Sequence, residues 1–197
     1  MLINLLRFLC PKAQRGLRAV AAAAVALFLS SCALMPEQGY EQNWAGRFSL
    51  QTEVYGQADR NSGNFKFSVN KNASELSLYG PLGITVAEIY EDDSTARLKR
   101  PDEPTVTAGN VEELMVKTVG FPIPVRELSE WLNGRPIPDK DFRLIERSDT
   151  LERFSQGGWL VSVFKNGGHP VKIEIRNAEP TADLSIKLIL LIRSSKL

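Results

Sequence analysis

Residues 63–69 read GNFKFSV, and this short stretch indicates the fold class. Apolar and polar residues alternate along it, so Phe65, Phe67 and Val69 share one face of an extended strand. Residues 75–79, ELSLY, repeat the alternation with leucine at every second position. Alternation of this kind, bounded by turn-forming residues, is typical of half-buried strands in an antiparallel sheet.

The same pattern of short β-like runs extends outward along most of the chain. Runs separated by turn-forming residues lie on both sides of a central region that lacks the alternation. The predicted strands are residues 44–54, 63–69, 75–79, 84–90, 95–99, 142–145, 151–155, 159–164, 171–175 and 184–192. A sheet with so many strands in a small domain curls or closes rather than staying flat.

The central region is predicted to be helical. Asn110 followed three residues later by Glu113 fits a capping box at a helix start, and Gly120 fits a cap at its end. Residues 125–132, VRELSEWL, predict a second short helix. We therefore predict a mainly β protein with a few α-helices, arranged as an incomplete antiparallel β-barrel with a helical lid.

A set of aromatic residues is expected to face the inside of this curved sheet. A packed core explains each of them alone, but a barrel of about eight or more strands can also enclose a ligand cavity. Both interpretations stay open, a filled core and an apolar cavity under the lid. The candidates to line that cavity are Phe65, Phe67, Trp131, Phe154 and Trp159.

The start of the chain has the pattern of a bacterial lipoprotein signal. Four basic residues and no acidic residue precede position 32, and residues 19–29 are apolar throughout. That apolar run is too short for a membrane-spanning helix, which needs about 20 residues, but it suits a signal peptide. The stretch that ends the run, LSSC at 29–32, resembles the lipobox, whose cysteine receives diacylglycerol on sulfur and an acyl group on nitrogen. We predict this double lipidation at Cys32, and Ala33 after it is typical of an outer-membrane address.

These features divide the chain into a cleaved signal peptide at 1–31, a lipidated tether at 32–43 and one domain at 44–197. The signal peptide carries four of the 24 basic residues and none of the 23 acidic ones, so the mature chain is net acidic. A nucleic-acid module would show a basic face, so we expect no nucleic acid partner. Because Cys10 leaves with the signal peptide and Cys32 is lipidated, no disulfide is expected.

Motifs for catalysis or metal binding are weak. The one histidine, His169, lies in a predicted turn, and no nucleophile-elbow or phosphate-binding glycine motif occurs. The acidic run at 91–93 is expected in a solvated turn and lacks the pattern of a calcium-binding loop. We therefore predict a protein that is not an enzyme and has no metal or cofactor.

The turn at residues 80–83, GPLG, has an unusual apolar tip. Proline at the second position of a turn is ordinary, but turn tips are usually polar. Leu82 either folds back into the core or projects outward, where it could contact a membrane or a partner's groove.

Taken in order along the chain, these pieces resemble the LolB family of outer-membrane lipoprotein receptors. The resemblance covers nearly all of the mature chain and rests on the order and spacing of its segments. Family members often carry tryptophan where this chain has Phe67, and residues 190–197 depart from the family pattern. The matching segments are residues 46–48, 80–83, 120–125, 128 with 131–134, 154–159 and 184–188.

The resemblance implies an open β-barrel with a helical lid over an apolar cavity. It implies a receptor, lipid-anchored on the periplasmic face of the outer membrane, that accepts acylated lipoproteins from the soluble periplasmic carrier LolA. The receptor then inserts them into the inner leaflet of the outer membrane. It also implies that Leu82 acts in this insertion step and that Phe67, Trp131 and Trp159 line the acyl cavity. We expect a monomer whose further partner is outer-membrane lipid.

Two other functions stay open from the residues alone. One is a structural or assembly outer-membrane lipoprotein with a filled β core and no acyl cargo. The other is a lipid-modifying enzyme that uses His169, although the residues offer no convincing catalytic set around it.

Overall fold

The computed structural model describes residues 40–181 and 183–196. The predicted signal peptide, Cys32 and most of the predicted tether at 32–43 therefore lie outside the described residues. All the described strands and helices belong to one unit, Tyr40–Leu197. This unit has its own hydrophobic core, so it contains what a domain needs to fold alone.

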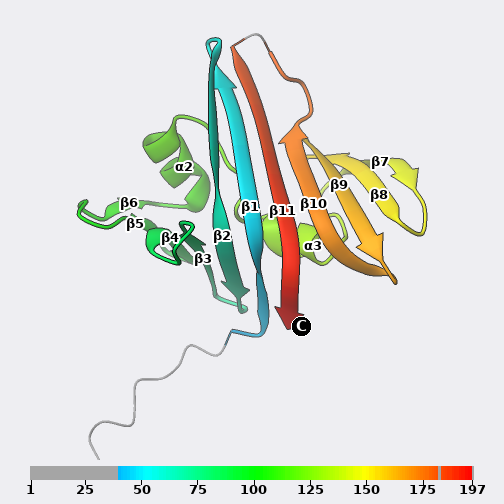
Figure 1. Ribbon diagram of the computed structural model, residues 1–197, viewed down its shortest axis with the longest axis horizontal. Helices are drawn as coiled ribbons and strands as arrows, with labels where there is room; N and C mark the ends of the chain where they lie inside the picture. Colours follow the sequence, from blue (N-terminus) through cyan, green and yellow to red (C-terminus); the bar gives the residue numbers. More distant parts are fainter. Residues whose placement is uncertain (1–39, 182, 197) are drawn as a thin grey trace, which may run out of the picture. The chain divides into compact units, whose positions relative to one another are not determined.

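The described residues form one open antiparallel sheet of 11 strands, which confirms the predicted mainly β fold (Figure 1). The strand order is β6-β5-β4-β3-β2-β1-β11-β10-β9-β8-β7, so the first and last strands pair in the middle and β6 and β7 form the edges. The bounds are β1 Gln42–Val54, β2 Gln57–Val69, β3 Ala73–Tyr79, β4 Thr85–Asp92, β5 Ala96–Lys99, β6 Val106–Ala108, β7 Phe142–Arg147, β8 Leu151–Gln156, β9 Trp159–Asn166, β10 His169–Asn177 and β11 Leu184–Lys196.

Two helices, α2 (Val111–Val119) and α3 (Leu128–Leu132), interrupt the run of hairpins where helices were predicted. The caps of α2 are confirmed: the Asn110 side chain accepts a hydrogen bond from the Glu113 N–H at 2.8 Å, and Gly120 ends the helix with φ 87°. The second helix is shorter than predicted, because residues 125–127 form a turn before it. In Figure 1, α3 lies behind β10 and β11.

Tight two-residue turns set the register of the β8–β9 and β9–β10 hairpins. Gly157 and Gly158 join β8 to β9 with φ values of 58° and 81°, and Gly167 and Gly168 join β9 to β10 with 57° and 82°. Two successive positive φ angles match the right-handed twist of paired strands and are open to glycine without strain. The turns therefore fix which side chains point inward.

The inner faces of the strands follow the predicted alternation. Phe65 and Phe67 on β2 are both buried, and the ring of Phe67 stacks on Trp44 of β1 with 5.7 Å between centroids. All the buried side-chain nitrogen and oxygen atoms in the described residues have a hydrogen-bond partner. The concave side of the sheet and the two helices thus enclose one continuous apolar core.

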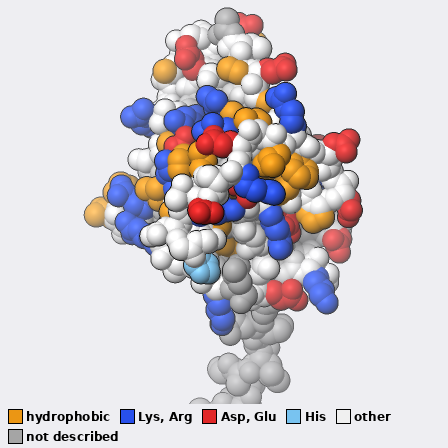
Figure 2. Space-filling view, turned by 90° about the vertical axis from the view of Figure 1, so that its right-hand side faces the viewer, with side chains coloured by type: hydrophobic (Ala, Val, Ile, Leu, Met, Phe, Trp, Pro, Cys, Tyr) orange, Lys and Arg blue, Asp and Glu red, His pale blue; other side chains and the backbone are white. Residues whose placement is uncertain are grey.

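The edge strand β7 is exposed along its whole length, which distinguishes it from every other strand next to the core. Hydrophobic and charged side chains are intermixed on the face of the protein where β7 and β8 lie (Figure 2). A bulge at Ile145 and the charges of Arg143, Glu146 and Arg147 interrupt the strand. Bulges and charges on an edge discourage pairing of the sheet with another chain.

Candidate functional site

A small apolar cavity lies between the sheet and the helices. Its volume is about 70 Å³, and every residue that lines it is apolar. Strands β1 to β4 and β11 supply the walls, and α2, the 120–127 segment and α3 supply the roof. The lining residues are Phe48, Leu50, Phe65, Leu76, Leu78, Ile89, Met115, Ile123, Val125, Leu128, Leu188 and Leu190.

The size of the cavity limits what it holds with the roof in this position. An engineered apolar cavity of about 150 Å³ stays dry and accepts one benzene molecule. The present cavity, at about 70 Å³, has less than half of that space. A long acyl chain therefore enters only if the roof moves away from the sheet.

Two buried polar groups hold the roof in place. The Glu91 carboxylate on β4 accepts hydrogen bonds from the Val111 N–H at the start of α2 and from the Arg126 guanidinium ahead of α3. The bond to Glu91 raises the pKa of Arg126. Glu91 is 6% exposed, so the expectation of a solvated acidic turn was wrong at this residue. The local sequence indicates that Glu91 lies near the end of a strand. It does not indicate that Arg126, 35 residues away, forms an ion pair with it.

Gln156 on β8 holds the other end of the roof. Its Oε1 accepts hydrogen bonds from the Trp131 indole at 3.3 Å and from the Ile137 N–H at 2.9 Å. Its Nε2 donates to the carbonyl oxygens of Ile137 and Lys140 at 3.1 and 3.0 Å. One buried amide thus joins α3, the segment after it and the sheet.

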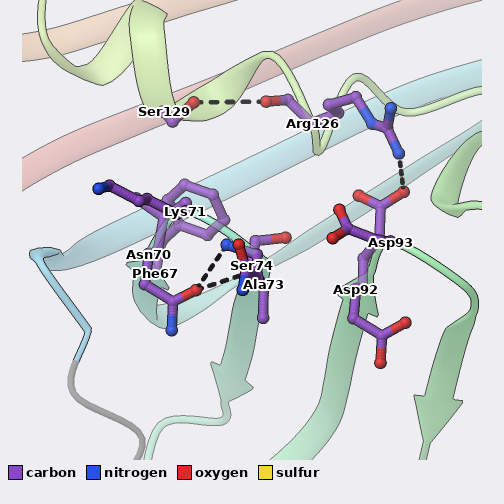
Figure 3. Close-up of a pocket in the computed structure, with 12 residues that line it drawn as sticks. Phe67, Asn70, Lys71, Ala73, Ser74, Asp92, Asp93, Arg126 and Ser129 are labelled. Carbon is purple, nitrogen blue, oxygen red and sulfur yellow. Dashed lines mark hydrogen bonds and ion pairs between the residues drawn. The ribbon is translucent and has the colours of Figure 1, made fainter.

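The five aromatic candidates do not lie together around the cavity. Phe65 lines it, whereas Phe67 stacks on Trp44 and lines a neighbouring, more polar pocket (Figure 3). Trp131 is fully buried on α3 and bonds to Gln156.

The remaining two candidates lie toward the β7 side of the sheet. Phe154 is fully buried and contacts the exposed Phe142 edge to face, with ring centroids 6.2 Å apart. Trp159 is partly buried and packs against the core. Neither ring is among those that border the apolar cavity.

Sequence reasoning missed most of the aliphatic lining. Leu50 continues the alternation of a predicted strand and Met115 lies in the predicted helix, so their burial carried a signal, whereas Ile89 lies on the face opposite to Ile84 and Val86. Ile123 carried none, because it lies between Pro122 and Pro124 in a segment without periodic structure. Its contact with the cavity depends on how the roof folds over the sheet.

The GPLG turn projects its leucine into solvent. Leu82 is 88% exposed and the following Ile84 is 65% exposed, so the inward alternative for Leu82 is excluded. The turn is closed by hydrogen bonds from the Gly80 N–H to the Ile84 carbonyl at 2.8 Å and from the Gly83 N–H to the Gly80 carbonyl at 3.0 Å. An apolar tip is thus held on a defined turn away from the core.

The one histidine of the chain is not among the residues that line the apolar cavity. His169 is exposed at the first residue of β10. Within residues 40–181 and 183–196 there is no group of three or more His, Cys, Asp or Glu residues able to hold a metal ion. None of the helices in that part is long and apolar enough to cross a membrane.

Comparisons with known proteins agree with this geometry. The family described as "Outer membrane lipoprotein LolB" matches residues 41–191. A protein named outer-membrane lipoprotein LolB from Cupriavidus metallidurans is 32% identical over 173 residues, which cover 82% of this chain and 81% of the relative. One from Bordetella petrii with the same name is 29% identical over 191 residues, or 91% of this chain and 94% of the relative.

The likeness to solved structures is weaker. A LolA superfamily protein from Nitrosomonas europaea is similar at 10% identity and a TM-score of 0.40, over 80% of this chain and 86% of that protein. The sequence relatives and the family match carry the assignment: this chain belongs to the LolB family of outer membrane lipoproteins.

Proposed function

We propose that this protein is a receptor that accepts acylated lipoproteins from the periplasmic carrier LolA and inserts them into the inner leaflet of the outer membrane. The observation that carries the proposal is the cavity roofed by two helices, whose lining is apolar throughout. Membership of the LolB family supports it. No nucleotide is needed if the receptor binds the acyl chains more tightly than the carrier does and the bilayer more tightly still.

The cost of exposing acyl chains to water explains why such a receptor is needed. Burial of a lipid chain is worth about 0.8 kcal/mol per CH₂ group, so a chain of roughly 16 carbons costs about 12 kcal/mol to expose. A transfer between two apolar cavities avoids that exposure. Within this chain, Phe65 and the aliphatic residues around it would hold the acyl chains after the roof moves.

Anchoring through Cys32 is part of the same proposal. Cleavage after residue 31 would leave Cys32 as the lipidated first residue of a tether, with the domain beginning near Trp44. Two or more acyl chains on one cysteine give stable membrane attachment, whereas one chain gives only marginal attachment. Cells grown with labelled palmitate should label the wild type and not Cys32→Ser; label on the variant would contradict the anchor.

Leu82 is proposed to act at the bilayer. Its exposure at the tip of a closed turn supports contact with lipid during delivery. The tip lies outside the residues that line the cavity, so binding and delivery are expected to be separable by mutation.

The small volume of the cavity favours a second candidate, a structural or assembly lipoprotein with a filled core. The two functions differ in acyl binding. A fluorescent fatty acid should bind the receptor saturably and in competition with a lipoprotein, whereas a filled core offers no saturable site.

Transfer from the carrier tests the receptor directly. A soluble chain lacking residues 1–32 is mixed with LolA that holds an acylated lipoprotein, and the two proteins are then separated. We expect the lipoprotein to move to the soluble chain without any nucleotide. If it stays on the carrier while the carrier still releases it to a known LolB, the receptor function is wrong.

A further inference from the structure

A second pocket adjoins the apolar cavity at one end of strands β2, β3 and β4. Its volume is about 250 Å³. The turn between β2 and β3, the end of β4 and two roof residues surround it, with Phe67 among its lining residues (Figure 3). It is open to solvent.

The two spaces share the same strands and the same inner face. Side chains two positions apart on a strand point to the same side, about 7 Å from each other. On each of three neighbouring strands, one residue lines the apolar cavity and the residue two positions away lines the second pocket. The pairs are Phe65 and Phe67 on β2, Leu76 and Ser74 on β3, and Ile89 and Glu91 on β4.

The roof repeats this change from apolar to polar. Val125 and Leu128 line the apolar cavity, and the residues that follow each of them, Arg126 and Ser129, line the second pocket. On β3, β4 and the roof, the inner surface therefore passes from apolar residues at the cavity to polar or charged residues one or two positions away, whereas β2 carries phenylalanine at both places. An amphiphile with its tails in the cavity has its head at this boundary.

The polar lining favours an uncharged head group. Asn70, Asn72, Ser74 and Ser129 supply neutral hydrogen-bonding groups. The Asn70 side chain already accepts hydrogen bonds from the N–H groups of Asn72 and Ala73, which orders the turn.

The charges around the pocket disfavour an anion. The Arg126 guanidinium is paired with Glu91, so its charge is already neutralised. At the rim, Lys71 is outnumbered by Asp92 and Asp93. Hydrogen bonds from the backbone N–H and hydroxyl of Ser94 lower the pKa of Asp92, which keeps that carboxylate ionised. A phosphate would meet more negative than positive charge here.

We propose that this pocket binds the polar head of an acylated lipoprotein, the glyceryl thioether of the acylated cysteine and the first peptide units after it. The acyl chains occupy the adjoining apolar cavity, and the peptide leaves through the open side of the pocket. The inference rests on the proposed receptor function and adds to it a preference for neutral lipopeptide heads over anionic phospholipid heads.

The test compares three palmitoylated competitors for displacement of a fluorescent fatty acid from the soluble chain of residues 33–197. They are methyl palmitate with one tail, and an N-acetylated S-dipalmitoylglyceryl cysteinyl-serine amide and dipalmitoylphosphatidylglycerol with two tails each. Ser74→Phe fills the pocket from β3. Ser62→Phe is the matched control, because Ser62 is exposed on β2 outside the pocket.

In the wild type, the lipopeptide should bind more tightly than the phospholipid. Ser74→Phe should weaken the lipopeptide about tenfold, the loss expected from one or two hydrogen bonds, and leave methyl palmitate unchanged. Asn72→Phe, at an exposed turn position on the same rim, should act in the same direction and serves if Ser74→Phe does not fold.

Each other outcome contradicts one of the two proposals. Equal losses for methyl palmitate and lipopeptide, or no loss for either, would overturn the head site and leave the receptor function intact. A wild type that prefers the phospholipid would also overturn it. A wild type that binds none of the three would contradict the receptor function itself.

Discussion

Filling the apolar cavity should stabilise the protein and impair its function together. Leu188 on β11 is 8% exposed and lines the cavity, so Leu188→Phe directs a ring into free space. The change adds three carbons; at about 0.8 kcal/mol per buried carbon, the gain in unfolding free energy is at most about 2 kcal/mol. For a domain of this size that corresponds to a rise in melting temperature of about 4–8 °C.

The same substitution should reduce acyl binding by at least about tenfold, because little of the 70 Å³ would remain. Thermal unfolding and fatty-acid displacement on the soluble chain measure the two effects. Leu191→Phe is the control: it makes the same change on the same strand at a residue that is 43% exposed, and it should alter neither property. A filled core would instead lose about 1–3 kcal/mol on overpacking. Destabilisation by Leu188→Phe with unchanged acyl binding would refute the reasoning.

Three further predictions address delivery, the roof and acid stability. Leu82→Glu should leave fatty-acid binding unchanged but stop transfer of lipoprotein to vesicles, measured by flotation; normal transfer would remove the turn from the mechanism. Gln156→Leu should lower the unfolding free energy by about 2–4 kcal/mol in urea titrations, because it leaves the Trp131 indole and three backbone groups without their partner. Burial alone would raise the pKa of Glu152, but hydrogen bonds from Lys165 and Arg147 outweigh it and lower the pKa. The stability that these bonds give is therefore present above the unfolded pKa of about 4.3 and is lost as the pH falls below it. The difference in unfolding free energy between wild type and Glu152→Gln should thus become smaller in acid. A difference that does not change with pH would contradict this prediction.

The sequence predicts the strands that border the core, because alternation records burial on one face. β3 and β8 were recognised on that basis, within two residues at each end. The first half of β2, residues 57–62, was missed because it is exposed on both faces, so its sequence shows no alternation of apolar and polar residues. It is a strand only because β1 supplies its backbone partners across the hairpin. β6, with three residues, is too short for any periodic pattern.

The candidate site was less predictable than the fold. Alternation identifies residues that face inward, and Phe65 was found in this way, but it cannot say which inward residues border free space. That depends on where the roof lies, and the roof is positioned by contacts between distant residues. Arg126 reaches Glu91 across 35 residues, and Trp131 reaches Gln156 across 25. No local pattern encodes such pairs.

The positions of these two contacts also indicate which part of the protein moves when the cavity fills. Glu91 fixes the start of α2 and Arg126, and Gln156 fixes α3 and the segment that follows it. Between Val111 and Arg126, the two residues held by Glu91, residues 119–125 cross the cavity and contribute Ile123 and Val125 to its roof. The turn and loop hydrogen bonds of that stretch are local: the Gly120 N–H donates to the Val116 carbonyl, the Val125 N–H to the Ile123 carbonyl, and the Leu128 N–H to the Val125 carbonyl. Because a local segment opens at lower free energy than a packed sheet, this crossing is the part that should lift to admit an acyl chain while the strands stay paired.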